Sequence, residues 1–139
     1  MDEIAFKRFL EESIAQVKHM ASYLGVSENE IAVDASDVFV PIQSSKFNRR
    51  FTLRVRVDSE YPVNPADYVF VNPENRNAEG IPYWPNDGGQ AFKLENPPWL
   101  CIMGTRAWVQ HGHPNPGTKF NLIENVVFSI FAKLSKLVE

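Results

Sequence analysis

Cys101 is the one cysteine of this chain, and its chemistry makes it the first candidate for a functional residue. A single thiol cannot form a disulfide within the chain, so Cys101 is either core filling or a nucleophile. We expect Pro97, Pro98 and Trp99 to stiffen the backbone before it, and Gly104 to loosen the backbone after it. The attacking species would be the thiolate, which requires a lowered thiol pKa or a nearby base. This segment alone leaves both interpretations open.

Two histidines, His111 and His113, follow closely enough in sequence to orient an attacking group or to assist proton transfer. The alternative is that their imidazoles only hydrogen-bond backbone groups. A zinc site of Cys101, His111 and His113 is rejected because it lacks a fourth ligand and the usual paired spacing. A cysteine protease is rejected because both bases would lie on the same loop as the nucleophile. No metal or cofactor is expected.

Length and composition predict one globular domain, residues 1–139, with 44% hydrophobic and 22% charged residues. The net charge is −3 and the longest basic run is the pair Arg49-Arg50, so we expect no nucleic-acid partner. No apolar stretch approaches membrane-spanning length, and the N-terminal segment lacks the layout of a signal peptide. Together with the single cysteine, these features predict a cytoplasmic protein with no membrane partner.

A helix is expected near each end of the chain. Apolar residues recur at helical spacing from Ile4 to Leu24, and Gly25 is expected to end that helix. Asn121 is expected to cap the second helix, with Glu124 completing a capping box. The buried stripe of the second helix is expected to consist of Leu122, Ile123, Val126, Val127, Ile130, Leu134 and Leu137.

Three segments between the helices predict an antiparallel meander. Residues 51–58 alternate between apolar and polar types, and the polar set includes Arg54 and Arg56. The arginine side is interpreted as a solvated sheet face, with a basic docking surface as the alternative. Residues 31–33 and 38–40 form one bulged strand or two short ones, residues 43–46 form a turn, and residues 68–71 form a further strand.

Residues 72–117 have a different character, because they hold most of the prolines and glycines and all three tryptophans. No periodic segment is expected there. Long loops inside a domain are usually functional or disordered, and the aromatic residues argue against disorder. We therefore expect an ordered loop around Cys101, with Trp99 and Trp108 as packing anchors, and this favours the nucleophile over core filling.

The order of these elements, together with three motifs, resembles the ubiquitin-conjugating enzyme family. Tyr61-Pro62-Val63-Asn64-Pro65 is similar to the Tyr-Pro-x-x-Pro segment of that family, and Trp84-Pro85-Asn86 is similar to its His-Pro-Asn triplet. Cys101 is followed by Trp108 and then by a helix, as the active cysteine of the family is. The resemblance implies an α+β, UBC-like fold: N-terminal helix, antiparallel β-meander, long active-site loop and C-terminal helix.

The resemblance also implies an activity, that of an acyl (thioester) transferase with Cys101 as its catalytic residue. Asn86 is then the family-based donor to the oxyanion, backbone N–H groups of residues 102–104 are the local donors, and His113 and His111 are supporting residues. The compact chain looks like the bacterial relatives that accompany CBASS antiphage systems. Its partner would be a cGAS-like nucleotidyltransferase with a flexible C-terminal tail. The alternative is a catalytically inactive UBC-like binding or scaffold module.

Overall fold

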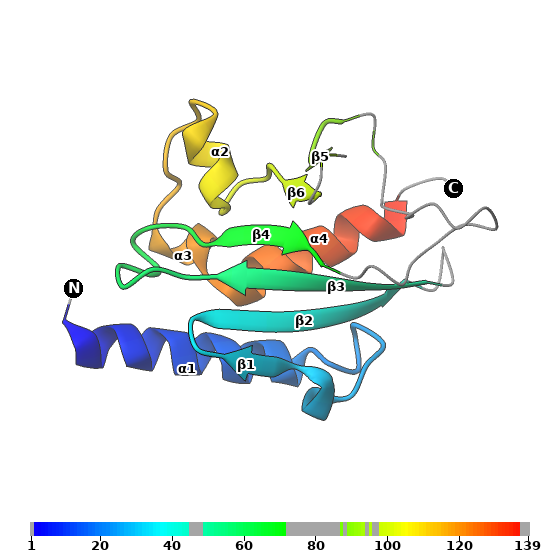
Figure 1. The fold of residues 1–139 in the computed structure, drawn as a ribbon, viewed down its shortest axis with the longest axis horizontal. Coiled ribbons are helices and arrows are strands. Elements are labelled where there is room, and N and C mark those ends of the chain that lie inside the picture. Colours follow the sequence, from blue (N-terminus) through cyan, green and yellow to red (C-terminus); the bar gives the residue numbers. More distant parts are fainter. Residues whose placement is uncertain are drawn as a thin grey trace.

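The computed structural model describes residues 2–44, 49–71, 87, 89–93, 95 and 98–136. Within these residues the fold is mixed α+β, with an N-terminal helix, a six-stranded antiparallel sheet and a C-terminal helix (Figure 1). The helices are α1 (Glu3–His19), η1 (Glu28–Glu30), α2 (Arg106–Gln110), α3 (Thr118–Asn121) and α4 (Ile123–Lys136). The strands are β1 (Ala32–Asp34), β2 (Asp37–Ser44), β3 (Arg49–Arg56), β4 (Asp67–Phe70), β5 (Phe92–Lys93) and β6 (Trp99–Leu100).

The sheet has the strand order β1-β2-β3-β4-β6-β5, so its first four strands form the predicted antiparallel meander. The segment that had two interpretations forms two strands, β1 and β2, joined by a tight turn in which Ala35 has φ +54°. The turn predicted to begin at Gln43 is wrong, because Gln43 still pairs with Arg50 and β2 continues to Ser44. Residues 45 and 46 of that prediction lie outside the described residues.

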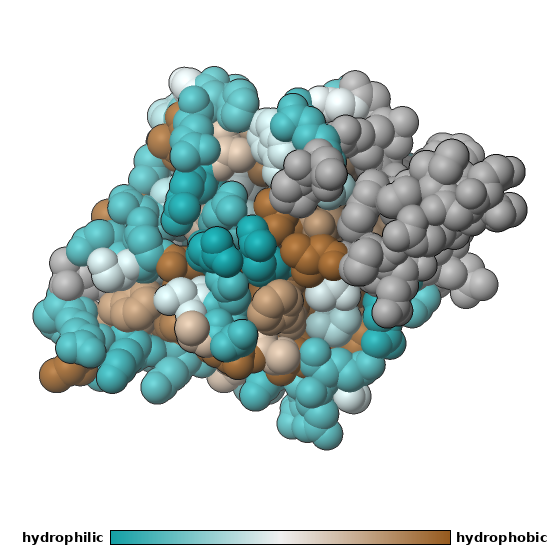
Figure 2. Space-filling model, viewed as in Figure 1, coloured by the Kyte–Doolittle hydropathy of each residue, from teal (hydrophilic) through white to brown (hydrophobic). Residues whose placement is uncertain are grey.

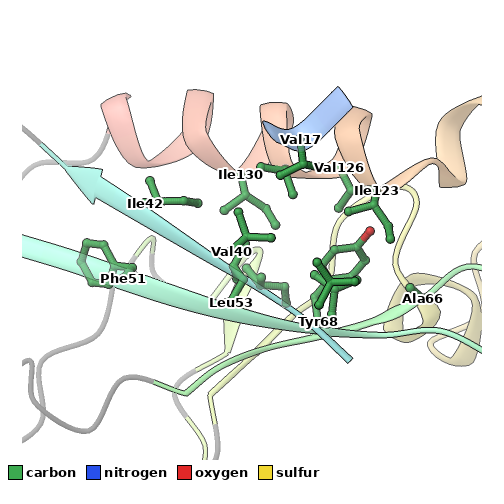
Figure 3. Packing of buried hydrophobic residues seen from close by; sticks show 14 of the residues in the cluster. Val17, Val40, Ile42, Phe51, Leu53, Ala66, Tyr68, Ile123, Val126 and Ile130 are labelled. Atoms are coloured by element: carbon green, nitrogen blue, oxygen red, sulfur yellow. The ribbon is translucent and has the colours of Figure 1, made fainter. Parts of the chain in front are cut away.

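One face of the sheet packs against α1 and α4 and forms the core (Figure 3). The alternation predicted for β3 is confirmed, because Leu53 and Val55 are fully buried while Arg56 is exposed. Figure 3 shows Val17 of α1 and Ile130 of α4 facing the apolar side chains of the strands. The second face of the sheet, opposite these helices, carries the arginines.

Helix α1 ends at His19, five residues before the predicted end at Leu24. Residues 20–25 form turns instead, and Leu24 remains fully buried there. The Leu24 carbonyl accepts a hydrogen bond from the Gln43 N–H at 2.8 Å, so this turn is joined to β2. The apolar spacing thus predicted burial correctly but not the helix boundary.

The predicted capping box of α4 is wrong. The helix begins at Ile123, and Asn121 is fully buried with its side chain turned to other loops. The Asn121 amide donates to the Pro62 carbonyl at 3.1 Å, and Glu124 accepts from the Ser13 hydroxyl at 2.7 Å. Tertiary partners therefore take both side chains that the local pattern assigned to the cap. The predicted stripe residues from Ile123 to Leu134 are buried, Leu122 is half-buried, and Leu137 lies outside the described residues.

The region from residue 72 to residue 117 is more structured than the sequence predicted. It contains β5, β6 and α2, although the two strands are only two residues long each. Such short elements leave no measurable period in a sequence. In the described part of the chain, no helix is both long enough and apolar enough to cross a membrane.

Candidate functional site around Cys101

Cys101 directly follows β6, the strand that lies between β4 and the edge strand β5. Its backbone N–H donates to the Ala91 carbonyl at 2.9 Å, so it extends the ladder that pairs β6 with β5 by one residue. Leu100 is fully buried in the core, whereas Trp99 and Cys101 are half-buried. Because side chains alternate along a strand, Trp99 and Cys101 share the face opposite Leu100. The thiol is therefore presented at the surface by a backbone fixed in the sheet.

The strand that pairs with Cys101 is itself anchored by Asp87. The Asp87 carboxylate accepts hydrogen bonds from the backbone N–H groups of Ala91, at 2.8 Å, and Phe92, at 3.2 Å. These bonds fix the start of β5 beside β6. Asn86, which the sequence analysis expected to be a donor to the oxyanion, is the neighbour of Asp87 in sequence and lies outside the described residues.

Thr105 closes the turn that follows Cys101. Its side chain is completely buried, and its hydroxyl donates to the Ile102 carbonyl at 2.8 Å. The same oxygen accepts from the N–H groups of Trp108, at 3.2 Å, and Ile102, at 3.4 Å. One hydroxyl thus caps α2 and fixes the backbone directly after the cysteine. This role was not predicted, although a threonine directly before the first residue of a helix is a common cap signal.

Gly104 does not loosen the backbone, as the sequence analysis expected; it lets the turn pack closely. Its φ is +98°, a conformation that residues with a side chain rarely adopt. A Cβ at this position would lie 2.3 Å from the Phe120 carbonyl oxygen and 2.6 Å from a methyl group of Val126. The turn after Cys101 is therefore pressed against the junction of α3 and α4.

His111 lies at the C-terminal end of α2 and stacks on Trp99. The centroids of the two rings are 5.0 Å apart, with an angle of 21° between their planes. The His111 Nδ1 lies 2.8 Å from the Ala107 carbonyl, so it donates there in the tautomer that carries its proton on Nδ1. The indole N–H of Trp99 in turn donates to the Glu95 carboxylate at 2.7 Å. The alternative in which the imidazoles only hydrogen-bond backbone groups thus describes one ring nitrogen of His111.

His113 is exposed and stacks on Trp108, with ring centroids 3.7 Å apart and planes 15° apart. In the described part of the chain, no hydrogen bond occupies its ring nitrogens, and none joins the Cys101 thiol to either imidazole. Trp99 and Trp108 are half-buried and lie outside the core cluster. They are therefore not core anchors; each indole packs against one histidine instead.

Two asparagines that the sequence analysis did not select for the site hold the loop of residues 110–116 in place. The Asn115 amide donates to the Val63 carbonyl at 3.0 Å, and its oxygen accepts from the Asn121 amide at 2.9 Å. Because Asn121 also bonds the Pro62 carbonyl, the loop is tied to the Tyr-Pro-x-x-Pro segment. No local pattern signals these contacts, since the partners are more than fifty residues apart in sequence.

The assembled site consists of a half-exposed thiol at the end of a strand, two imidazoles on indole platforms, and a backbone fixed on both sides of the thiol. A thiolate there could attack an activated carbonyl that approaches from solvent. A comparison of the chain with known protein families, with curated proteins and with solved structures finds no match.

Proposed function

We propose that this protein is a bacterial ubiquitin-conjugating-enzyme-like acyl transferase that carries the C-terminus of a partner protein as a thioester on Cys101. The observation that supports this proposal best is the presentation of the only cysteine. Cys101 is half-exposed, bonded to Ala91 on one side and followed by the Thr105-closed turn on the other. A cysteine that only fills the core would be buried, and its function would not require a fixed turn after it.

The reaction has two acyl-transfer steps. The Cys101 thiolate attacks the carbonyl of an acyl adenylate or of another thioester, and the tetrahedral intermediate expels AMP or a thiolate. An amine or water then attacks the thioester carbonyl, loses its proton to a base, and releases Cys101 as the leaving group. His113, whose ring nitrogens are not engaged in the described residues, is the first candidate for that base. Asn86 is the proposed donor to the oxyanion, and His111 has a supporting role.

The proposed partner is a cGAS-like nucleotidyltransferase of a CBASS antiphage system, in the cytoplasm. Its flexible C-terminal tail would enter beside Cys101, next to residues 110–116. A glycine is the expected last residue, because a bulky Cβ would restrict the approach of the carbonyl to the sulfur.

Co-expression of the two proteins tests this function. We expect an adduct that reducing agents cleave, seen by non-reducing electrophoresis and intact-protein mass spectrometry. Cys101→Ser should give a reductant-resistant ester, and Cys101→Ala should give no adduct while the domain still unfolds cooperatively. Deletion of the last residues of the partner should abolish the adduct but keep the two proteins bound. An adduct that survives Cys101→Ala, or full defence activity of that variant, would refute the proposal.

The competing function is a catalytically inactive binding module, and one observation favours it. Within the described residues, no base is hydrogen-bonded to the Cys101 thiol. The two functions differ in thiol reactivity, which iodoacetamide labelling at neutral pH measures. Labelling faster than that of free cysteine supports the transferase, and labelling at or below that rate supports the module.

A further inference from the structure

The face of the sheet opposite the helices has Arg54 near its centre. Register places Phe39 of β2 and Val69 of β4 directly beside Arg54, and Trp99 of β6 directly beside Val69. Directly paired residues of antiparallel strands project on the same face, so these four side chains form one row across four strands. We call this row the Arg54 row. Figure 2 shows strongly hydrophilic atoms beside hydrophobic ones in the middle of this face.

Arg54 differs from the two other arginines on its side of β3. Arg50 forms an ion pair with Glu30, and Arg56 binds both carboxylate oxygens of Asp37, at 2.8 and 3.0 Å. Arg54 has no hydrogen bond and no ion pair to any described residue, and its Nε is completely buried without a partner. A buried donor without a partner costs free energy, so the site is incomplete as it stands.

The Nε of Arg54 is as buried as the other unpartnered buried atoms of the described residues, but its residue is more exposed than theirs. Those atoms are the Tyr68 hydroxyl and the Asn121 side-chain oxygen, in residues that are 1% and 0% exposed. No protein group from outside can reach them. The Arg54 side chain as a whole is only half-buried, on the face of the sheet opposite the helices, so part of it is open to a second molecule. The planar fork of a guanidinium suits a carboxylate, which accepts two parallel hydrogen bonds.

We propose that the Arg54 row is a docking surface for a segment of another protein that presents one Asp or Glu carboxylate between apolar side chains. Arg54 binds the carboxylate, and Phe39 and Trp99 contact the apolar neighbours. Charge selects this occupant over nucleic acid, because Glu30 and Asp37 are in direct contact with the two flanking arginines, and Arg54 alone on this side of β3 has no described carboxylate in direct contact, although Asp37 attracts it from a distance. This surface goes beyond the proposed function, since it requires no chemistry at Cys101.

The test uses the full chain labelled with ¹⁵N and two short peptides. The buried Nε–H of Arg54 should give a resolved NMR signal, and it reports binding directly. The probe is acetyl-Leu-Glu-Leu-amide, and acetyl-Leu-Gln-Leu-amide is its neutral control. We expect the Glu peptide to shift the Arg54 signal and the amide signals of Phe39 and Val69 saturably. The Gln peptide should bind with an affinity lower by a factor of roughly ten or more.

Two variants complete the experiment. Arg54→Gln should lose the shifts at Phe39 and Val69 caused by the Glu peptide, and Arg54→Lys should weaken them, because lysine keeps the charge but lacks the fork. Arg50→Gln is the matched control on the same face and should retain them, because Arg50 is already bound to Glu30. Equal shifts with the two peptides, full binding by Arg54→Gln, or no saturable shift would overturn the proposal. A shift of the Arg54 signal with protein concentration alone would assign the surface to a second copy instead.

Discussion

Polar side chains gather in two regions of this molecule and are used differently in each. In the core, a hydroxyl pair joins α1 to the Tyr-Pro-x-x-Pro segment and to α4. The Ile123 N–H donates to the Tyr61 hydroxyl at 2.9 Å, Tyr61 bonds Ser13, and Ser13 donates to Glu124. Around Cys101, by contrast, polar rings stack on half-buried indoles, and the nitrogens of His113 have no partner in the described residues.

This difference predicts which substitutions change the stability of the fold and which change the reactivity of the site. Each hydroxyl of the core chain donates one bond and accepts another, so removing one leaves its neighbours unpaired in an apolar environment. An exposed imidazole that rests on a ring can be removed without leaving a buried group unpaired. Substitutions in the first region should therefore lower the free energy of unfolding, and those at His113 should change reactivity.

Gly104 is the strongest test of this comparison, because it lies in the Cys101 region yet is packed as tightly as the core. Gly104→Ala should lower the free energy of unfolding by roughly 2–6 kcal/mol, from the strained positive φ and the contact with the Phe120 carbonyl. Gly112→Ala is the matched control, since its φ is +92° but nothing lies within 4 Å of the added carbon. It should cost only about 1 kcal/mol. Urea unfolding followed by tryptophan fluorescence measures both, and equal losses would contradict the packing.

Tyr61→Phe tests the core region. Loss of the hydroxyl leaves the Ile123 N–H without an acceptor and removes the bond that the Ser13 hydroxyl accepts, so stability should fall by about 1–3 kcal/mol. Tyr23→Phe is its control, because the Tyr23 side chain is 53% exposed. That change should stay within about 0.5 kcal/mol. If the two substitutions cost the same, the hydroxyl chain does not stabilise the fold.

Alkaline pH should weaken the stabilisation that the Tyr61 hydroxyl provides. Burial raises the pKa of Tyr61 from 10.0 to about 12, because the folded protein disfavours the phenolate. The stabilisation is therefore complete below about pH 10 and is lost as the pH rises toward 12, where the unfolded state ionises first. The stability gap between wild type and Tyr61→Phe should narrow over that range. A constant gap from pH 9 to pH 11.5 would contradict the raised pKa.

Trp108→Ala should have a smaller effect than a core tryptophan would. A fully buried ring costs about 3–5 kcal/mol on truncation, but this half-buried ring supports only an exposed histidine. We expect a loss of about 1–2 kcal/mol, measured by the same unfolding experiment. A loss above about 3 kcal/mol would show that Trp108 anchors the core.

His113→Ala should have the smallest effect on stability, within about 0.5 kcal/mol, because the side chain is exposed. If the proposed function holds, it should still slow the formation or discharge of the thioester, as should Asn86→Ala. Melting temperature and the rate of adduct formation, measured on the same preparation, separate the two effects. A His113→Ala protein destabilised as much as Tyr61→Phe would make this histidine structural.

The sequence predicted elements whose signal is local and repeated. Strand β3 was predicted because its residues alternate over eight positions, and α4 because its apolar stripe spans more than three turns. Strands β5 and β6 were missed because two residues carry no period. Asn121 was assigned to a cap because its local pattern fits one, yet partners far away in sequence hold it.

Within the candidate site, sequence reasoning selected the thiol and both histidines but not the groups that support them. The indole platforms, the Thr105 hydroxyl and the close approach at Gly104 depend on how α2 and α3 fold back on the sheet. Residue types cannot specify such distances, since they arise only when segments far apart in sequence meet.

The two borders of the sheet affect how this protein can associate with other chains. Strand β1 forms one border with three residues, all exposed and ending in Asp34, and β5 forms the other with two residues. Among the described residues, neither border offers a long row of free backbone groups, and intermolecular sheet extension or amyloid-like stacking requires such a row. Strand addition at these borders is therefore disfavoured, and partners are left to recognise side chains on the faces and loops.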